Sequence, residues 1–369
     1  MDRQRSDIAI FGNLDVRGGG SRVFVNNIKE WVADGLTVEL VGYRQAAPIF
    51  PEELPEQVRF HHLGTNHNLT TSFALWLYVL KYRPRVLVGS SHRSNLLLCH
   101  LARFPSHETR IWLTVHQDFV YSGKRSGREK ARKLAEVKRY YPNANGIICV
   151  SKGAADNLKE ATLLPENKVH AVHNAVLDSS VMARAAIPVQ HPWLDDPCEK
   201  VFIAVGRLAE QKDFGTLISA FGKVRKQVKS RLIILGEGPE RKVLEQQIQR
   251  EGLVQDVELK GFVENPYSWI ARSDVFVSSS RWEGFGNVIA EALGIGLPIV
   301  STDCPSGPSE ILCEGRYGEL VPVQDSEALA SGMIRAMESE HNADTMKDAA
   351  TRFWAKNTAP QYLRLFGLE

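Results

Sequence analysis

The most constraining feature of this sequence is an alternation of short, continuous apolar runs with longer stretches of helical periodicity. Such runs are typical of strands in parallel sheets, because helices cover those sheets on both faces. The runs lie at residues 8–12, 37–43, 85–90, 110–116 and 146–151 in the first half, and at 201–206, 231–236, 257–262, 274–280 and 297–302 in the second. We therefore predict two doubly wound α/β domains.

A break in this alternation marks a domain boundary. Residues 175–199 fit neither pattern and contain three prolines, which is typical of a linker or hinge. The chain of 369 residues is also longer than one ordinary domain of roughly 100–200 residues. We predict a first domain formed by residues 1–175 with the C-terminal segment 355–369, and a second domain formed by residues 176–354.

Composition excludes several classes of protein. The chain has 45 Lys and Arg against 43 Asp and Glu, which argues against a dedicated nucleic-acid-binding protein. Its longest apolar window, residues 69–80, is well short of the roughly 20 residues that a membrane-spanning helix needs. The N-terminal residues lack the apolar core of a signal peptide, and the five cysteines form no C-x-x-C pair. We therefore expect reduced thiols and a cytoplasmic location.

A glycine-rich turn follows the first apolar run. Gly18, Gly19 and Gly20 precede a helical pattern, where glycine lets the backbone approach a ligand and present N–H groups to a phosphate. Their spacing does not match the G-x-G-x-x-G fingerprint of dinucleotide-binding domains. A tight turn without a ligand explains this stretch equally well.

Two cations, Arg207 and Lys212, follow the first apolar run of the second half. In a parallel sheet this is the carboxyl end of a strand, where ligands gather. A guanidinium and an ammonium there would stabilise the negative charge that builds on a departing diphosphate. Solvated surface charge is the alternative interpretation.

The segment RWEGFGNVIAE carries two carboxylates around a glycine turn. We expect Glu283 in the loop after an apolar run, a helix that begins near Asn287, and Glu291 about one turn inside that helix. The N–H groups of Phe285, Gly286 and Asn287 would then suit a phosphate, and the carboxylates would accept hydrogen bonds from sugar hydroxyls. In the alternative interpretation, Glu291 complements the helix dipole and Glu283 is a surface charge. The predicted buried face of the helix consists of Val288, Ile289, Ala292 and Leu293.

This segment resembles the E-x7-E motif of the retaining glycosyltransferases of family 4. Other segments of the second half resemble that family in the same order: VGRLAEQKDFGTLISAF, LGEGPER, GFVENPYSWIARSDVFVSSS and GLPIVSTDCPSGPSEIL. The first half resembles it more loosely, through the glycine turn, TVHQD, CVSKGA and VHNAV. The resemblance implies the GT-B architecture, in which two Rossmann-like domains face each other across a deep cleft.

The resemblance also implies roles for individual residues. Glu291 would bind the ribose hydroxyls of a nucleotide sugar, and Glu283 would hold the donor sugar. Arg207 and Lys212 would neutralise the leaving diphosphate, and His116 of the first domain would touch the donor sugar. Further donor contacts, including recognition of the base by the backbone near Val263, would come from Gly18, Gly19, Gly20, Gly238, Pro239, Val263, Phe285, Gly286 and Asn287.

The sequence departs from the family at one point and contains no metal motif. The family usually has Asp directly after the His, whereas Gln117 separates His116 from Asp118 here, and a satisfied histidine at a strand end is the alternative interpretation of His116. Family 4 retains the anomeric configuration, and its favoured front-face mechanism needs no protein nucleophile. Because the chain has no Asp-x-Asp motif and no His or Cys cluster with zinc spacing, we expect no metal and no other cofactor.

A basic segment between residues 124 and 139 is a candidate acceptor or membrane site. It would dock on anionic lipid headgroups, or on a lipid-linked or lipopolysaccharide acceptor, at the inner face of the cell membrane. A solvated helix is the alternative. Tyr121, Tyr140 and Tyr141 would lie at this interface, and His92 and Arg93 would line the acceptor site. The basic residues are Lys124, Arg125, Arg128, Lys130, Arg132, Lys133, Lys138 and Arg139.

The predicted function is therefore transfer of a hexose or N-acetylhexosamine from a nucleotide sugar, UDP-linked by the resemblance, to a lipid-linked or cell-surface glycan. Alternatives are a GDP-mannose-dependent transferase of the same fold and a non-catalytic protein that binds sugar nucleotides. The first-domain glycine turn and His116 favour catalysis. A nicotinamide-dependent oxidoreductase fits less well, because it should show the dinucleotide fingerprint with an acid about 20 residues later.

Overall fold

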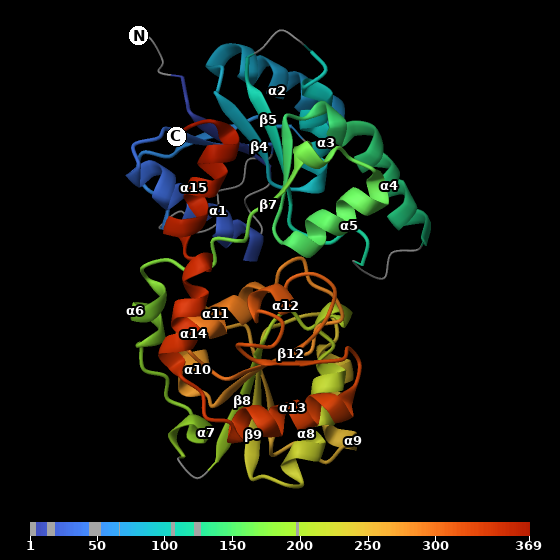
Figure 1. Ribbon diagram of the computed structural model, residues 1–369, viewed down its shortest axis with the longest axis vertical. Helices are drawn as coiled ribbons and strands as arrows, with labels where there is room; N and C mark the ends of the chain where they lie inside the picture. Colours follow the sequence, from blue (N-terminus) through green and yellow to red (C-terminus); the bar gives the residue numbers. More distant parts are fainter. Residues whose placement is uncertain are drawn as a thin grey trace. The chain divides into compact units, whose positions relative to one another are not determined.

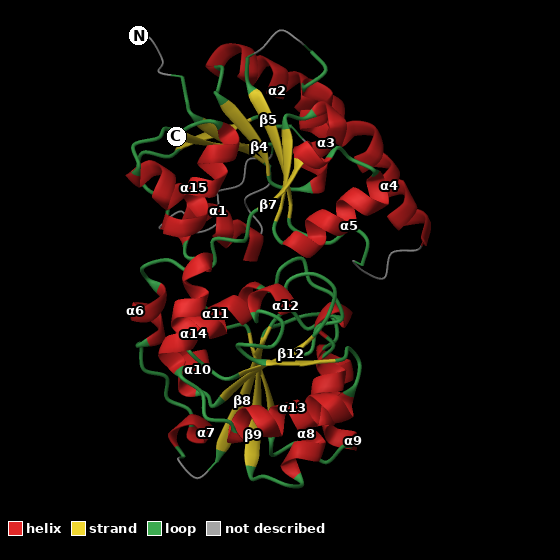
Figure 2. Cartoon of the chain, viewed as in Figure 1, coloured by secondary structure: helices red, strands yellow, loops and turns green. Residues whose placement is uncertain are grey.

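Each half of the chain builds one sheet in which every strand pair is parallel, as the apolar runs predict. In both halves helices lie on both sides of the strands (Figure 2). The computed structural model describes residues 5–12, 19–43, 53–65, 67–104, 108–121, 127–196 and 199–369.

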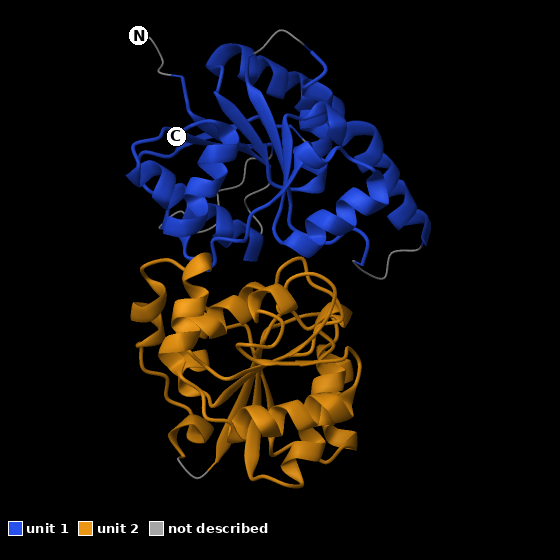
Figure 3. Cartoon of the chain, in the orientation of Figure 1, with its two compact units in different colours: residues 1–176, 353–369 blue, residues 177–352 orange. Residues whose placement is uncertain are grey.

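The chain divides into two units (Figure 3). Unit 1 consists of residues 1–176 and 353–369, and unit 2 consists of residues 177–352. Unit 1 thus extends one residue beyond the range 1–175, and its C-terminal part begins two residues before residue 355.

Unit 1 contains a seven-stranded sheet with the order β3-β2-β1-β4-β5-β6-β7. The order reverses between β1 and β4, so the connections that leave these two strands run in opposite directions. The strands are β1 (Ile8–Phe11), β2 (Val38–Gly42), β3 (Arg59–His62), β4 (Val86–Gly89), β5 (Arg110–Val115), β6 (Gly146–Cys149) and β7 (Val169–Ala171).

The central strands of this sheet are buried on both faces, because their alternate side chains enter different cores. On β1, Ala9 and Phe11 pack with residues of α2, α3, α4 and α5, whereas Ile8 and Ile10 pack with α1 and α15. The C-terminal helix α15 is fixed to α1 by Trp31, whose Nε1 donates to the carbonyl of Ala359 at 3.2 Å. The helices are α1 (Gly19–Ala33), α2 (Asn68–Tyr82), α3 (His92–Leu101), α4 (Gly127–Tyr140), α5 (Lys152–Thr162) and α15 (Ala355–Phe366) (Figure 1).

Unit 2 contains a six-stranded sheet with the order β10-β9-β8-β11-β12-β13. Helices α8, α9 and α13 pack into the core on one face of this sheet, and α10, α11 and α14 pack against one another. The strands are β8 (Lys200–Val205), β9 (Ser230–Leu235), β10 (Val257–Gly261), β11 (Val275–Ser278), β12 (Ile299–Thr302) and β13 (Glu319–Val321). The helices are α6 (Val181–Ala185), α7 (Pro192–Asp195), α8 (Phe214–Arg225), α9 (Arg241–Arg250), α10 (Pro266–Arg272), α11 (Asn287–Ile295), α12 (Pro308–Ile311), α13 (Ser326–Glu338) and α14 (Ala343–Ala350).

Three strands are absent from the predicted set: β3, β7 and β13. All three lie at sheet edges and have three or four residues, and β3 reads Arg-Phe-His-His. A short edge strand has one neighbour and partial solvent exposure, so it needs no continuous apolar run.

No helix in the described ranges combines the length and the apolar character that crossing a bilayer requires.

Candidate functional site

Two loops at the carboxyl edge of the unit 2 sheet meet where the strand order reverses. One loop follows β8 and the other follows β11, the position at which parallel sheets open a crevice for ligands. Hydrogen bonds fasten the two loops together. Arg281 N donates to Gln211 O at 2.8 Å, Ser279 Oγ donates to Lys212 O at 2.7 Å, and Gln211 Nε2 donates to Trp282 O at 3.0 Å.

These contacts bring Lys212 and Glu283 together, although 71 residues separate them in the sequence. Lys212 Nζ lies 2.5 Å from Glu283 Oε1, and Ser280 Oγ donates to the same carboxylate oxygen at 2.7 Å. Glu283 is only 7% exposed, so the interpretation of this residue as a surface charge is wrong. Arg207, on the same β8 loop, is exposed and pairs with no acid in the part of the chain that the structure describes. The crevice therefore holds one neutralised cation and one cation available to an anion.

The helix N-terminus lies where the sequence predicts it, because α11 begins at Asn287. Gly286 precedes it with φ 102°, a left-handed conformation that favours glycine, and this residue offers no side chain to cap the helix. The preceding carbonyl, that of Phe285, packs against Gly307, where an added Cβ would lie 1.8 Å from the Phe285 oxygen. The DCPSGP segment thus packs against the turn through a backbone contact that only glycine permits at position 307.

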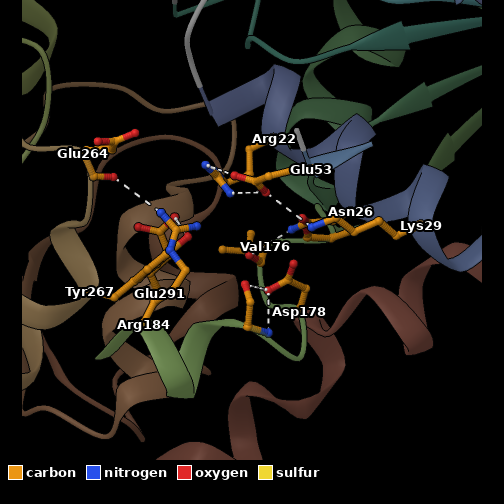
Figure 4. Close-up of polar contacts among 12 residues, drawn as sticks. Arg22, Asn26, Lys29, Glu53, Val176, Asp178, Arg184, Glu264, Tyr267 and Glu291 are labelled. Carbon is orange, nitrogen blue, oxygen red and sulfur yellow. Dashed lines mark hydrogen bonds and ion pairs between the residues drawn. The ribbon is translucent and has the colours of Figure 1, made fainter. Parts of the chain in front are cut away.

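Glu291 lies one turn inside α11 and is buried, with 8% exposure. Tyr267 Oη donates to Glu291 Oε1 at 3.4 Å, and the guanidinium of Arg184 lies 4.8 Å above the Tyr267 ring. Arg184 Nη2 also donates to the carbonyl of Glu264 at 3.4 Å, next to Val263 (Figure 4). Tyr267 of α10 and Arg184 of α6 are candidate site residues that the sequence did not reveal, because Tyr267 reaches Glu291 from another helix and Arg184 contacts Tyr267.

The buried face of α11 is wider than predicted. Ile289, Ala292 and Leu293 are fully buried, as expected, but Val288 is partly exposed. Every residue from Ile289 to Ile295 is buried, including Glu291. A carboxylate in such a position needs hydrogen-bond partners, and a ligand hydroxyl at this edge could be one of them.

Gly238 has a packing role that the structure explains directly. An added Cβ at Gly238 would lie 2.2 Å from the carbonyl oxygen of Leu208. The contact brings the loop after β9 against the loop after β8, and Leu208 N donates to Glu237 O at 3.0 Å. Pro239 is exposed at the rim of this turn, and Val263 is partly buried after β10.

In unit 1, His116 follows β5 and lies under the first turn of α1. An added Cβ at Gly20 would lie 3.8 Å from the His116 ring, which Phe24 contacts edge-on. His116 Nε2 lies 3.0 Å from Thr114 Oγ1, and Thr114 Oγ1 donates its proton to the carbonyl of Gly89. Thr114 must therefore accept from His116, which places the imidazole proton on Nε2.

The other ring nitrogen of His116, Nδ1, is buried and has no hydrogen-bond partner among the described residues. Burial lowers the pKa of His116 to about 4, so the ring is neutral at pH 7. A neutral imidazole with its proton on Nε2 leaves the Nδ1 lone pair as an acceptor. His116 can thus receive a hydrogen bond from a hydroxyl group.

Comparison with known proteins identifies the family. Residues 17–178 match the family described as Glycosyltransferase Family 4, and residues 191–353 match the family described as Glycosyl transferases group 1. An uncharacterised glycosyltransferase of Methanocaldococcus jannaschii is 30% identical over 309 residues, which are 74% of this chain and 76% of that protein. The chain belongs to glycosyltransferase family 4. It is therefore a glycosyltransferase of the retaining hexosyltransferase class.

Other relatives match over shorter ranges. The N-acetylgalactosamine-N,N'-diacetylbacillosaminyl-diphospho-undecaprenol 4-alpha-N-acetylgalactosaminyltransferase of Campylobacter jejuni is 30% identical over 216 residues, which are 58% of this chain and 56% of that enzyme. The lipopolysaccharide core biosynthesis glycosyltransferase LpsD of Rhizobium meliloti is 30% identical over 233 residues, which are 62% of this chain and 65% of that enzyme.

Solved structures give the fold of this family 4 enzyme as GT-B. A glycosyltransferase from Rickettsia africae matches with a TM-score of 0.78 over 98% of both chains, at 14% sequence identity. The Anabaena protein Alr3699/HepE in complex with UDP matches with a TM-score of 0.76 at 18% identity, over 98% of this chain and 99% of that chain. The predicted fold class, two doubly wound parallel-sheet domains, is confirmed.

The remaining predicted residues of this family 4 enzyme fall into two groups. His92 has both ring nitrogens occupied, Nδ1 by Tyr141 and Nε2 by Glu136, each at 3.0 Å, and Arg93 Nε donates to Asn68 Oδ1 at 3.1 Å. Both residues lie in the first turn of α3, and these contacts give them structural roles there. Gly18, Lys124 and Arg125 lie outside the described residues, whereas Arg128 and Arg132 are exposed on α4.

The prediction that Tyr141 lies at an interface is wrong. Tyr141 is fully buried in the unit 1 core, and its hydroxyl accepts from Asn95 Nδ2 at 3.1 Å. Tyr121 is exposed and Tyr140 is partly buried.

In the described ranges, no group of three or more His, Cys, Asp and Glu side chains is arranged to hold a metal ion.

Proposed function

We propose that this family 4 enzyme transfers a hexose or N-acetylhexosamine, with retention, from a UDP-sugar to a lipid-linked or cell-surface glycan. The observation that carries the proposal is the crevice of unit 2. There the first turn of α11 lies between two buried carboxylates, Glu283 and Glu291, and two cations stand on the facing loop.

The crevice suits a nucleotide sugar because its charges match the parts of that molecule. The helix N-terminus, Arg207 and Lys212 attract the diphosphate. Glu291 accepts hydrogen bonds from the ribose hydroxyls, and Glu283 accepts them from the donor sugar. The backbone near Val263 contacts the base, and Arg184, which holds the adjacent Glu264 carbonyl, positions that loop.

The Lys212–Glu283 ion pair joins the residue that we assign to the donor sugar, Glu283, to one that stabilises the leaving diphosphate, Lys212. In the absence of a ligand the ammonium neutralises a carboxylate that is almost fully buried. As the bond from the anomeric carbon to the diphosphate breaks, negative charge grows on the phosphate oxygens, and Lys212 and Arg207 stabilise it. The departing oxygen takes the proton of the acceptor hydroxyl, and that hydroxyl bonds to the anomeric carbon on the same face.

His116 contributes as a hydrogen-bond acceptor rather than as a base. Its neutral ring and its acceptor Nδ1 fit a hydroxyl of the donor sugar. Gly20 lies beside this ring and leaves room for the donor because it carries no side chain, and Gly19 precedes it at the start of α1. We assign Gly18 of the same turn to this role from the family resemblance alone.

Relatives support the acceptor and sugar classes. The Campylobacter enzyme is named as an N-acetylgalactosaminyltransferase that acts on a diphospho-undecaprenol-linked sugar, and the Rhizobium enzyme is named for lipopolysaccharide core biosynthesis. The Anabaena structure contains UDP. In this chain the basic face of α4, with Arg128 and Arg132 exposed, suits an anionic lipid-linked acceptor or the membrane surface that carries it.

A thermal-shift panel tests the donor. Purified protein is heated with UDP, GDP, ADP, UDP-glucose, UDP-N-acetylglucosamine and GDP-mannose. A ligand that binds the native state at about 100 times its Kd stabilises it by about 2.7 kcal/mol, so UDP and one UDP-sugar should raise Tm clearly. A response to GDP and GDP-mannose alone would establish the GDP-mannose alternative instead. NMR of the product then gives the anomeric configuration, which should match that of the donor.

A further inference from the structure

Helix α2 of unit 1 is apolar on the side that faces away from the protein. Thr71, Leu75, Tyr78 and Val79 are buried against the unit 1 core. Leu69, Phe73 and Leu77, spaced four residues apart and therefore on one stripe of the helix, are 86%, 61% and 46% exposed. The Phe73 ring lies 5.9 Å from that of Trp76, which broadens the stripe with a second aromatic side chain. An exposed apolar stripe of this kind marks a surface that a partner covers.

The surroundings of this stripe are positively charged. Between Glu56 and Glu108 the sequence contains no Asp or Glu at all, in a chain that is otherwise nearly balanced in charge. Lys81, Arg83 and Arg103 are exposed at the ends of α2 and α3. The same run also contains Arg93, which bonds to Asn68, and Arg59 and Arg85, which form ion pairs with Glu39 and Asp7 from outside the run. A covering partner should therefore be apolar and anionic.

The stripe belongs to the same helical layer as the basic helix α4. Helix α2 packs beside α3, and α3 packs beside α4, on one face of the seven-stranded sheet (Figure 1). The N-terminal end of α2 is fixed at the carboxyl edge of the sheet, because Arg93 at the start of α3 bonds to Asn68. Leu69 is thus close to the edge where unit 1 presents its loops to ligands.

We propose that the stripe of Leu69, Phe73 and Leu77 inserts into the headgroup region of an anionic lipid bilayer, with the cations of α2, α3 and α4 on the lipid phosphates. Apolar and aromatic side chains flanked by Lys and Arg have the composition of interfacial helices. With 15 residues α2 is too short to span a bilayer, so it lies in the surface plane. A second copy of this chain fits less well, because a symmetric contact would bring the same cations together.

The inference rests on the proposed lipid-linked acceptor, because a surface-bound enzyme would meet such an acceptor at the edge where α2 begins. It names an insertion element that the basic segment alone does not supply. Electrostatic attraction brings the protein to the membrane surface. The stripe then buries apolar side chains in the bilayer, and this contribution to binding persists when salt screens the charges.

Vesicle flotation of the full chain tests the inference. We expect binding to vesicles of phosphatidylcholine mixed with phosphatidylglycerol, and little binding to phosphatidylcholine alone. Phe73→Gln with Leu77→Gln should reduce the partition coefficient on mixed vesicles at least about tenfold, because it removes two of the inserting side chains. Gln has nearly the helix propensity of Leu, so α2 should remain folded. The matched control is Val243→Gln, an exposed apolar residue on α9 of unit 2, which should leave partitioning unchanged.

The outcomes test membrane insertion of α2 separately from the proposed function. If the wild-type chain does not float with mixed vesicles, or if the Phe73 and Leu77 substitutions leave flotation unchanged, α2 is not an insertion element. If light scattering shows a dimer that the same substitutions dissociate, a second copy covers the stripe and the membrane proposal is wrong. The UDP thermal shift of every variant is measured in parallel, so a loss of vesicle binding with a normal response to UDP leaves the proposed function intact.

Discussion

Replacing Lys212 with Met removes the ammonium from the buried ion pair and keeps most of the side chain. The carboxylate of Glu283 then stays 7% exposed, with Ser280 Oγ at 2.7 Å and Gln211 Nε2 at 3.4 Å as its remaining donors among the described residues. Breaking a fully buried ion pair by removing one partner costs about 3–5 kcal/mol. Because two donors remain, and because 18% of the Lys212 side chain is exposed, we expect a loss of about 2–3 kcal/mol.

A second substitution shows whether the stranded charge causes the loss. Glu283→Gln in the Lys212→Met background removes the charge, and the amide oxygen can still accept from Ser280. The double variant should therefore recover at least about half of the lost stability. Scanning calorimetry of the full chain measures this effect. For a unit of this size about 1 kcal/mol corresponds to about 2–4 °C, so Lys212→Met should lower the unit 2 transition by about 5–10 °C.

The control is a second Lys–Glu pair in unit 2 that is largely solvated. Lys223 pairs with Glu327, whose side chain is 80% exposed, and Lys223→Met should cost about 0–1 kcal/mol. If Lys212→Met lowers the stability no more than Lys223→Met does, a stranded Glu283 charge is not the cause of the loss. The same conclusion follows if the effects of Lys212→Met and Glu283→Gln simply add, because additive effects mean that the two side chains do not interact.

Three further outcomes are expected. Turnover by Lys212→Met should fall about 10²–10³-fold, as for loss of one group that stabilises developing charge, and a normal kcat would contradict that role. Activity should persist in EDTA, and strict dependence on added Mg²⁺ or Mn²⁺ would show that a metal takes part. His116 has a native pKa of about 4, below the unfolded value of about 6.5, so the unfolded state binds more protons between these values and stability falls as pH drops from 6.5 to 4, by up to about 3 kcal/mol. Denaturant titrations of the wild type and His116→Asn should diverge across that range, and parallel pH profiles would show that His116 is not buried as a neutral ring.

The interior of the fold could be predicted from the sequence because the central strands are buried on both faces. In Ile8–Phe11 alternate side chains pack into different cores, and in Lys200–Val205 the side chains of residues 201–204 are all buried, so each strand leaves a continuous apolar signal. Edge strands such as Arg59–His62 carry no such signal. Their pairing depends on backbone hydrogen bonds with a neighbour, which any residue except proline can make.

The start of α11 could also be predicted, because glycine before a helical pattern is a local signal. What the sequence did not reveal were contacts between distant segments. The ion pair of Lys212 and Glu283 joins loops 71 residues apart, and Arg184 reaches Tyr267 from the segment that precedes β8. Burial of Glu291 follows from the packing of α11 among α10 and α14, which no periodicity records.

For helix α2 the sequence left a different question open. Its apolar residues formed a window too short to span a membrane, but the sequence did not show which of these side chains enter the core and which face away from it. Only the structure assigns Leu75 to the core and Phe73 to the outer stripe. The same ambiguity misplaced Tyr141, which follows a basic helix yet lies in the core.

In the proposed function the donor diphosphate lies at the N-terminus of α11, with Glu291 on the ribose. Calorimetric titration of UDP into the wild type and Glu291→Ala tests this placement, and the matched control is Glu327→Ala, which replaces an exposed glutamate at the start of α13. Loss of a hydrogen bond to a charged group costs about 1.5–3 kcal/mol, so Glu291→Ala should bind UDP about 10–100 times more weakly, whereas Glu327→Ala should bind like the wild type. Equal UDP affinity for Glu291→Ala and the wild type, with both proteins folded, would contradict the claim.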